Sequence, residues 1–145
     1  MLIKEKYLSW LPKKSPKVGS ILAVDDDFAI RVILHNVLKN SFNVSVFGNG
    51  IEVLLWLKEG NIPDVIVSDI SMPELNGFDL LESLSQSGLY NSIPIIILSG
   101  HEESEVKSQM LKYQNPVTFI RKPFDPINVQ QHLLDILQAK RLAVR

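Results

Sequence analysis

The sequence predicts an α/β fold in which a parallel sheet is covered by helices on both faces. Short apolar runs alternate five times with longer segments whose apolar residues recur at helical spacing. The runs VIVS (65–68) and IPIIIL (93–98) are mostly apolar, which is typical of strands buried on both faces. Charged or hydroxyl residues follow four of the five runs, and such sheets bind ligands beyond the carboxyl ends of their strands.

Local signals place the individual elements. The first helix has one apolar side, and Asp27 precedes it as an N-cap, because a short carboxylate accepts hydrogen bonds from free first-turn amides. Gly60 stops the second helix, and Pro94 belongs at the start of its strand because proline lacks the amide that a ladder needs. The expected strands are 21–24, 43–47, 65–68, 93–98 and 118–120, and the expected helices are 28–38, 51–60, 78–86, 102–112 and a last one from residue 126.

The composition limits the functions that the chain can have. Its 145 residues, 46% hydrophobic and 21% charged, are typical of one globular domain. A formal net charge of −1 argues against binding nucleic acid through bulk charge. The absence of cysteine excludes disulfides, thiolate catalysis and cysteine-ligated zinc. No apolar run approaches a membrane span and no signal-peptide pattern is present, so we expect a cytoplasmic protein that does not insert into membranes.

The chain divides into three parts. Residues 1–20 hold five lysines and one glutamate and form an N-terminal extension, residues 21–138 form the domain, and residues 139–145 form a C-terminal tail. We expect no output domain, because too little chain follows the last helix. The sequence leaves open whether the extension binds anything. Its apolar residues are compatible with a short helix: Leu2, Ile3, Tyr7, Leu8 and Leu11.

Polar residues at the ends of four strands are candidates for one site. Asp25 and Asp26 follow the first strand, Asp69 follows the third, Ser99 closes the fourth and Lys122 follows the last. Because the carboxyl ends of parallel strands meet at one edge, we expect these side chains to face one another. Clustered carboxylates repel each other and raise one another's pKa, and Mg²⁺, which prefers oxygen ligands, relieves that repulsion.

These residue types match the needs of phosphoryl transfer. A metal held by two carboxylates and a main-chain carbonyl clamps a phosphoryl oxygen and neutralises charge. A neighbouring carboxylate attacks phosphorus and forms an aspartyl phosphate, while a lysine and a hydroxyl contact the remaining oxygens. Taken singly, the same residues are also explained as a solvated loop aspartate, a helix-capping cluster and a surface lysine; their combination favours the site.

Four segments resemble the characteristic blocks of response-regulator receiver domains: VDDDFAIR (24–31), SDISMPELNG (68–77), ILSG (97–100) and FIRKPF (119–124). They arrive in the order found in that family. The resemblance implies a flavodoxin-like, doubly wound (βα)5 fold with a five-stranded parallel sheet of order 2-1-3-4-5. It also implies a stand-alone receiver that takes a phosphoryl group from a sensor histidine kinase or a phosphotransfer protein in the presence of Mg²⁺.

The resemblance assigns the chemical roles by position. Asp69 matches the phosphoacceptor. Asp25 and Asp26 match the acidic pair, with Asp26 binding Mg²⁺ directly and Asp25 acting partly through water. The backbone carbonyl of Ser71 matches the remaining metal ligand. Ser71 and His101, two residues past the acceptor and two past Ser99, match the positions that tune hydrolysis, and we hypothesise that they control access of the attacking water.

The resemblance also implies a switch. Ser99 matches the hydroxyl that moves toward the phosphoryl group, and Phe119 matches the aromatic whose rotamer follows. Lys122 matches the family's lysine, and its bond to Pro123 is expected to be cis. Phosphorylation is expected to change a protein-interaction face made of helix 102–112, strand 118–120 and the last helix. The downstream target and a phosphorylation-dependent homodimer are left open by the sequence.

Two other classes of function were weighed against this interpretation. Haloacid-dehalogenase-type phosphatases also form an aspartyl phosphate, but they place the nucleophile in a D-x-D motif after the first strand, whereas the best acceptor here follows the third. A pseudo-receiver would bind proteins without phosphorylation, and the complete set of site residues argues against it. We therefore expect no enzyme acting on a separate substrate, only catalysis of the domain's own phosphorylation and dephosphorylation.

Overall fold

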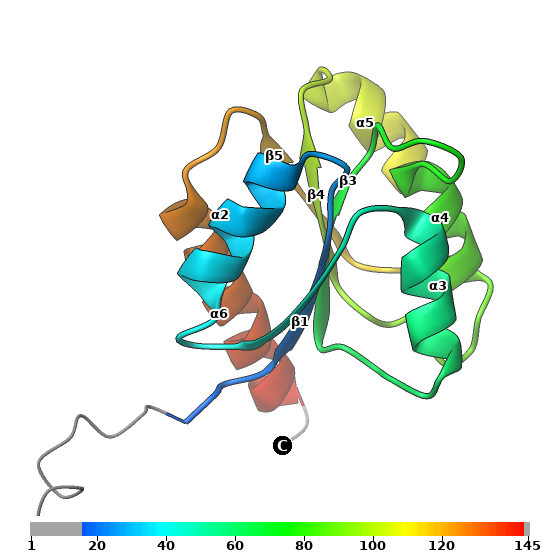
Figure 1. Ribbon diagram of the computed structural model, residues 1–145. Helices are drawn as coiled ribbons and strands as arrows, with labels where there is room; N and C mark the ends of the chain where they lie inside the picture. Colours follow the sequence, from blue (N-terminus) through cyan, green and yellow to red (C-terminus); the bar gives the residue numbers. More distant parts are fainter. Residues whose placement is uncertain (1–15, 144–145) are drawn as a thin grey trace, which may run out of the picture.

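The computed structural model describes residues 16–143, which form a five-stranded parallel sheet and five helices (Figure 1). The strand order β2-β1-β3-β4-β5 confirms the predicted order. The strands are β1 (Ser20–Val24), β2 (Asn43–Phe47), β3 (Val65–Asp69), β4 (Ile95–Ser99) and β5 (Val117–Arg121). The helices are α2 (Phe28–Leu38), α3 (Gly50–Lys58), α4 (Gly77–Ser85), α5 (Glu103–Met110) and α6 (Pro126–Ala143).

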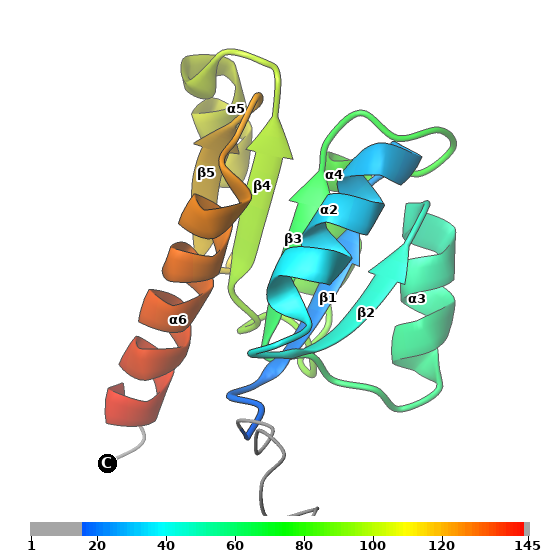
Figure 2. The same cartoon turned by 60° about the vertical axis from the view of Figure 1, so that its left-hand side comes forward.

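Helices cover both faces of the sheet, as predicted. α2 and α6 pack on one face and lie in front of the sheet in Figure 2, while α3, α4 and α5 pack on the other. Successive strand residues alternate between the two cores, since side chains point to opposite faces of a sheet. In β1, Ile21 and Ala23 pack with α2 and α6, and Leu22 and Val24 pack with the opposite layer.

The two central strands β3 and β4 are buried along their whole length. This burial explains their continuous apolar character, because each face of the strand meets a helix layer. β4 begins at Ile95, directly after Pro94, so the strand starts later than predicted. The carbonyl of Pro94 still accepts a hydrogen bond from Ile66 N at 3.0 Å.

Side chains and one glycine define the helix ends. Asp27 accepts hydrogen bonds from the amides of Ala29 and Ile30 and caps α2, as predicted. Asn76 caps α4 in a reciprocal pair with Asp79, in which each side chain accepts from the other residue's amide. α3 ends just before Gly60, whose φ of 102° is a left-handed conformation that glycine adopts without steric cost.

The structured chain extends beyond both predicted domain boundaries. β1 begins at Ser20, and α6 continues to Ala143, so residues 139–143, predicted as part of a tail, belong to the last helix. Its last turns are anchored by Lys140, which donates to the carbonyl of Asp64, and by Arg141, which donates to the carbonyl of Val18. Most of the predicted extension, residues 1–15, lies outside the described residues. Within residues 16–143, no helix combines the length and apolar character required to cross a bilayer.

The turn after β3 depends on Gly77. A Cβ at this residue would lie 2.3 Å from the carbonyl oxygen of Asp69 and 2.8 Å from the Cα of Ile70, both of them backbone atoms. The amide of Gly77 donates to the carbonyl of Ile70 at 2.8 Å and closes the loop. The absence of a side chain therefore lets α4 start against the end of the strand that carries Asp69.

Gly77→Ala is expected to destabilise the domain, because the added methyl group forces backbone atoms apart. Overpacking of this kind costs about 1–3 kcal/mol in the free energy of unfolding. Urea denaturation measures the change, with Gly88→Ala as the matched control, since a Cβ at Gly88 meets no atom within 4 Å. Equal stability of the two variants would contradict this account of the turn.

Candidate functional site

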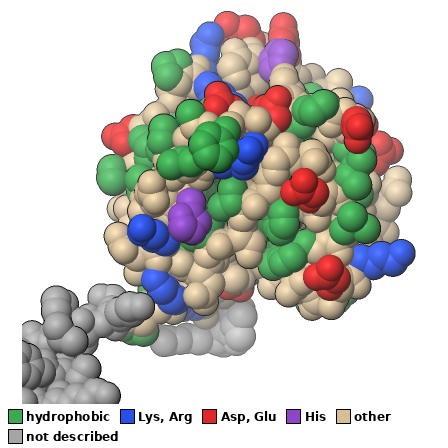
Figure 3. Space-filling model, viewed as in Figure 1, with side chains coloured by type: hydrophobic (Ala, Val, Ile, Leu, Met, Phe, Trp, Pro, Cys, Tyr) green, Lys and Arg blue, Asp and Glu red, His purple; other side chains and the backbone are tan. Residues whose placement is uncertain are grey.

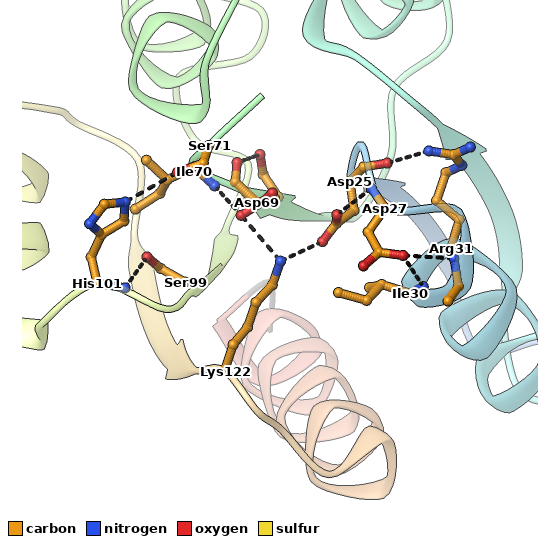
Figure 4. Close-up of polar contacts among 12 residues, drawn as sticks. Asp25, Asp27, Ile30, Arg31, Asp69, Ile70, Ser71, Ser99, His101 and Lys122 are labelled. Atoms are coloured by element: carbon orange, nitrogen blue, oxygen red, sulfur yellow. Dashed lines mark hydrogen bonds and ion pairs between the residues drawn. The ribbon is translucent and has the colours of Figure 1, made fainter. Parts of the chain in front are cut away.

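The predicted site residues converge at the carboxyl edge of the sheet. Asp25 and Asp26 follow β1, Asp69 ends β3, Ser99 ends β4 and Lys122 follows β5. Acidic side chains gather at this end of the molecule, at the top of Figure 3. The close-up in Figure 4 shows the side chain of Lys122 reaching between those of Asp25 and Asp69. Side chains from the carboxyl ends of three strands, β1, β3 and β5, therefore meet at one point.

The ammonium group of Lys122 bridges two carboxylates. Its Nζ lies 2.9 Å from Oδ2 of Asp25 and 3.3 Å from Oδ1 of Asp69. Burial alone would lower the pKa of Lys122, but the hydrogen bond with Asp25 and the charges of Asp69 and Asp25 outweigh burial and raise it. The lysine is therefore a fixed positive charge at the centre of the site.

Asp69 is an unusually basic carboxylate. It is 5% exposed, and burial, together with the charge of Asp25, raises its pKa from 3.8 to about 6. Lys122 and the amide of Ile70, which donates to Oδ1 at 2.8 Å, lower the pKa but only partly offset that rise. The ionised carboxylate is therefore stabilised less than it would be in water.

The three carboxylates fit a hard divalent cation. Asp25, Asp26 and Asp69 each offer an oxygen, and these oxygens lie within 4.8 Å of one another. Asp25 and Asp69 are buried, and Asp26 is exposed at the mouth of the site. An all-oxygen set with an open side suits Mg²⁺, which keeps several water ligands. A single ammonium group leaves the charge of the three carboxylates incompletely compensated, so the residues present fit the predicted metal.

Arg31 has a role that was not identified in the sequence. Its Nη1 donates to the carbonyl of Asp25 at 2.7 Å, while the amide of Asp27 donates to Oδ1 of Asp25 at 2.9 Å. The amide of Asp25 donates to the carbonyl of Phe47 at 3.2 Å. Asp25 is thus held by its backbone and by its side chain. The sequence signal is the arginine in VDDDFAIR, one and a half helical turns past the acidic pair.

Ser71 and His101 join two loops beside the site. The Oγ of Ser71 lies 3.1 Å from Nε2 of His101, although the residues are 30 positions apart. The amide of His101 donates to Oγ of the buried Ser99 at 3.0 Å. The loop after β3 and the loop after β4 are therefore connected through side chains next to Asp69 (Figure 4).

The remaining predicted residues lie on β5 and in the loop that follows it. Phe119 is partly buried and packs against the core on the α3, α4 and α5 side of the sheet. The peptide bond between Lys122 and Pro123 is cis, as expected. Just before β5, Asn115 is buried, and its Nδ2 donates to the carbonyls of Tyr90 and Ile93, each at 2.9 Å.

The fold and this arrangement of carboxylates and lysine define a class of signalling domain. A family model for the response regulator receiver domain matches residues 21–134. The chain belongs to the response regulator receiver family, whose members act in two-component signalling with histidine kinases or phosphotransfer proteins.

Curated relatives differ greatly in length from this chain. The two-component response regulator ORR3 of Oryza sativa subsp. indica is 30% identical over 122 residues, which are 83% of this chain and 90% of that protein. The DNA-binding transcriptional regulator NtrC of Escherichia coli K12 is 36% identical over 109 residues, 74% of this chain but 22% of that protein. Histidine kinase P4 of Formosa agariphila is 29% identical over 83% of this chain and 9% of that protein.

Solved structures agree with the family assignment. The chemotaxis response regulator CheY4 of Vibrio cholerae superimposes with a TM-score of 0.74 at 27% identity, covering 81% of this chain and 98% of that one. The receiver domain of the Francisella response regulator 1452 gives 0.73 at 29% identity, covering 84% and 98%. Both likenesses extend over nearly the whole of the compared receiver.

Asp69→Asn is expected to stabilise the metal-free domain at neutral pH. The pKa of Asp69 is about 6 in the folded protein against 3.8 for an aspartate in water, so the stability of the wild type falls as pH rises between these two values. The isosteric amide of asparagine does not ionise, so the variant does not lose this stability. The gain in unfolding free energy is at most about 3 kcal/mol above pH 7.

The measurement is urea denaturation without metal between acidic and neutral pH. The difference in unfolding free energy between Asp69→Asn and wild type should be smallest below pH 3.8, the ordinary pKa, and reach a plateau above pH 6, near the pKa in the folded protein. Asp135→Asn, at an exposed aspartate of α6, is the control. A stability gain that is identical at every pH, or a loss of stability at neutral pH, would contradict the raised pKa of Asp69.

Proposed function

We propose that Asp69 accepts a phosphoryl group from the phosphohistidine of a sensor histidine kinase or phosphotransfer protein. The observation that carries this proposal is the ammonium group of Lys122, held between a buried nucleophilic carboxylate and the carboxylate of Asp25. In the transfer, an oxygen of Asp69 bonds to phosphorus as the donor's P–N bond breaks, and the electron pair returns to the imidazole nitrogen. The product is an aspartyl phosphate.

Each neighbouring residue has a defined part in this step. Lys122 offsets charge on the phosphoryl oxygens, and Ser99 donates its hydroxyl to one of them. The carboxylates of Asp25, Asp26 and Asp69 and the backbone carbonyl of Ser71 are the groups that would hold Mg²⁺. When bound, Mg²⁺ supplies positive charge that offsets both the carboxylates and the phosphoryl oxygens. Asp69 then reacts in its ionised form in spite of its raised pKa.

An apolar surface next to Lys122 supports docking of the phosphodonor. Phe28 is 71% exposed and Ile127 is 61% exposed, at the starts of α2 and α6. Between these helices lies a groove of about 510 Å³ lined by Ile30, Ile33, Lys122, Pro123, Phe124 and Pro126. A helix that carries a phosphohistidine and an apolar face would be the occupant of this surface, close to the acceptor.

The proposed output is a change in the face formed by α5, β5 and α6. Ser99 ends β4 and pairs in register with Arg121 of β5, two residues after Phe119. Movement of Ser99 toward a phosphoryl group would change the loop that begins α5 and the packing of Phe119. Binding of a downstream protein or of a second copy would follow from that change.

Incubation of the protein with Mg²⁺ and acetyl phosphate, or with beryllofluoride, is expected to give one adduct at Asp69. Asp69→Asn removes the nucleophile and should abolish the adduct, while Asp135→Asn should leave it intact. Intact-protein mass spectrometry measures the phosphoryl group. Fluorescence of Trp56, which packs against Phe47 on the strand next to β1, follows beryllofluoride binding.

The same experiment separates the alternative functions. Multiple turnover of small phosphate esters would indicate a phosphatase and overturn the proposal. No adduct and no response to beryllofluoride in folded protein would indicate a domain that binds partners without phosphorylation. Phosphorylation that persists in Asp69→Asn would mean that another residue is the acceptor.

Ser71 and His101 are proposed to set the lifetime of the aspartyl phosphate. Their side chains join the loops on either side of the acceptor, which restricts the path of the water that attacks phosphorus and regenerates the carboxylate. Ser71→Ala or His101→Ala should speed phosphate loss about fivefold, as expected if each removes one hydrogen bond worth about 1 kcal/mol. Radiolabelled phosphate release measures the rate.

His35→Ala is the control for this prediction, because His35 is an exposed histidine of α2. Because Ser71 and His101 contribute to one contact, the double variant should lose phosphate no faster than the faster single variant. Unchanged release in both single variants would discard the proposed role of the pair.

A further inference from the structure

The guanidinium group of Arg31 lies between three parts of the chain. Its Nη1 donates to the carbonyl of Asp25, directly after β1, at 2.7 Å (Figure 4). Its Cζ lies 5.6 Å from the centre of the Phe28 ring, at the start of α2. A Cβ on Gly48, in the loop after β2, would lie 3.2 Å from Nη1, so the absence of a side chain there leaves room for the guanidinium. Arg31 therefore connects the end of β1, the start of α2 and the loop after β2.

The hydrogen bond from Arg31 fixes the backbone of a residue of the acidic site. Asp25 is 1% exposed, and its carboxylate accepts from Nζ of Lys122 and from the amide of Asp27, each at 2.9 Å. Its amide donates to the carbonyl of Phe47 at 3.2 Å, and its own carbonyl accepts from Arg31. A displacement of this backbone would therefore move a carboxylate that belongs to the candidate metal group.

Arg31 does not neutralise the acidic site by pairing with a carboxylate. Within residues 16–143 its guanidinium forms no ion pair, although three aspartates in a row follow β1. The guanidinium donates to a main-chain carbonyl instead, and hydrogen bonds from a charged donor are about twice as strong as neutral ones. These contacts are those of a group that holds backbone in place.

The ring of Phe28 restricts the positions that the guanidinium can take. Phe28 is 71% exposed, so most of its ring is not used by the core. Phe28 and Arg31 are three positions apart and therefore lie on one side of α2. A cation over an exposed aromatic ring gains about twofold to fivefold in the population of that position. Because Phe28 belongs to the proposed docking surface, its ring connects that surface with Arg31.

We propose that Arg31 is a positioning residue for the Mg²⁺ site and that Phe28 supports it, so that the exposed start of α2 influences metal affinity. This inference rests on the proposed function, which includes Asp25 among the groups that would hold Mg²⁺. By fixing the backbone of Asp25, Arg31 keeps the carboxylate beside Lys122 and within reach of the other two aspartates. Groups that orient metal ligands typically contribute about tenfold to hundredfold to metal affinity.

Positioning and charge predict opposite effects of removing the guanidinium. As a positive charge near the site, Arg31 repels a divalent cation, so its removal would strengthen Mg²⁺ binding if charge were its only influence. As a positioning residue, Arg31 keeps a carboxylate in place, so its removal weakens Mg²⁺ binding. The sign of the change in Mg²⁺ affinity therefore distinguishes the two roles.

The test is calorimetric titration of the full chain with Mg²⁺ at constant ionic strength. Arg31→Met keeps an unbranched side chain without the guanidinium and should weaken Mg²⁺ binding about tenfold or more. Arg31→Lys keeps the charge and one donor and should weaken it less. Phe28→Leu removes the ring and should weaken binding about twofold to fivefold, because the guanidinium loses its aromatic contact.

Two exposed residues of the same region are the controls. Lys39→Met removes one positive charge just after α2, and Val32→Ala removes exposed apolar atoms one turn after Phe28. Both should bind Mg²⁺ like the wild type, and all variants should keep the wild-type circular dichroism spectrum. Because Phe28 acts through Arg31, the variant with both Phe28→Leu and Arg31→Met should bind Mg²⁺ no more weakly than Arg31→Met alone.

Several results would overturn the inference. Unchanged or tighter Mg²⁺ binding by Arg31→Met would exclude a positioning role, and an equal loss in Lys39→Met would reduce the effect to bulk charge. Additive losses in the double variant would show that Phe28 does not act through Arg31. If these results appear while the wild type binds Mg²⁺ and forms the Asp69 adduct, only this inference fails. If Arg31→Met weakens Mg²⁺ binding but the wild type forms no adduct with acetyl phosphate, the positioning role is supported and the proposed function fails.

Discussion

Three carboxylates and one ammonium group lie at one edge of the sheet. The excess of negative charge among them determines the properties of the site. Lys122 lies between Asp25 and Asp69, yet the pKa of Asp69 remains about 6 because its burial and the charge of Asp25 outweigh that contact. A carboxylate held this way is poorly stabilised as an anion until more positive charge arrives. In the proposed function, this unbalanced charge links metal binding and phosphoryl transfer to the same few atoms.

The parallel sheet makes this crowding possible. Strands that point in one direction bring the ends of β1, β3, β4 and β5 together, although the residues concerned are up to 97 positions apart. Buried β3 and β4 form a rigid base for Asp69 and Ser99, and the absence of a side chain at Gly77 lets the next helix start against that base. The loops that follow β3 and β4 are connected by the exposed side chains of Ser71 and His101, which suits the proposed switch.

The two edges of the sheet carry opposite charge for related reasons. Helices in this fold begin near the carboxyl ends of the strands and end near their amino ends, so acidic residues gather at one edge and basic residues at the other. The acidic edge is the proposed phosphorylation site. The basic edge is where the lysine-rich extension joins the domain.

Several features were identified from sequence because each leaves a local signal. They are the alternation of apolar runs, the Asp27 cap and the candidate site residues Asp25, Asp26, Asp69, Ser99 and Lys122. The sequence did not reveal that α6 continues to Ala143, since anchoring by Val18 and Asp64 involves distant backbone. The contact of Arg31 with the carbonyl of Asp25 and the contact between Ser71 and His101 were also not predicted, although the sequence contains the arginine and had paired the other two residues by position. Local pattern determined which residues are candidates for the site. Only tertiary packing decided which of them touch, because those contacts depend on the direction of each side chain across separate loops.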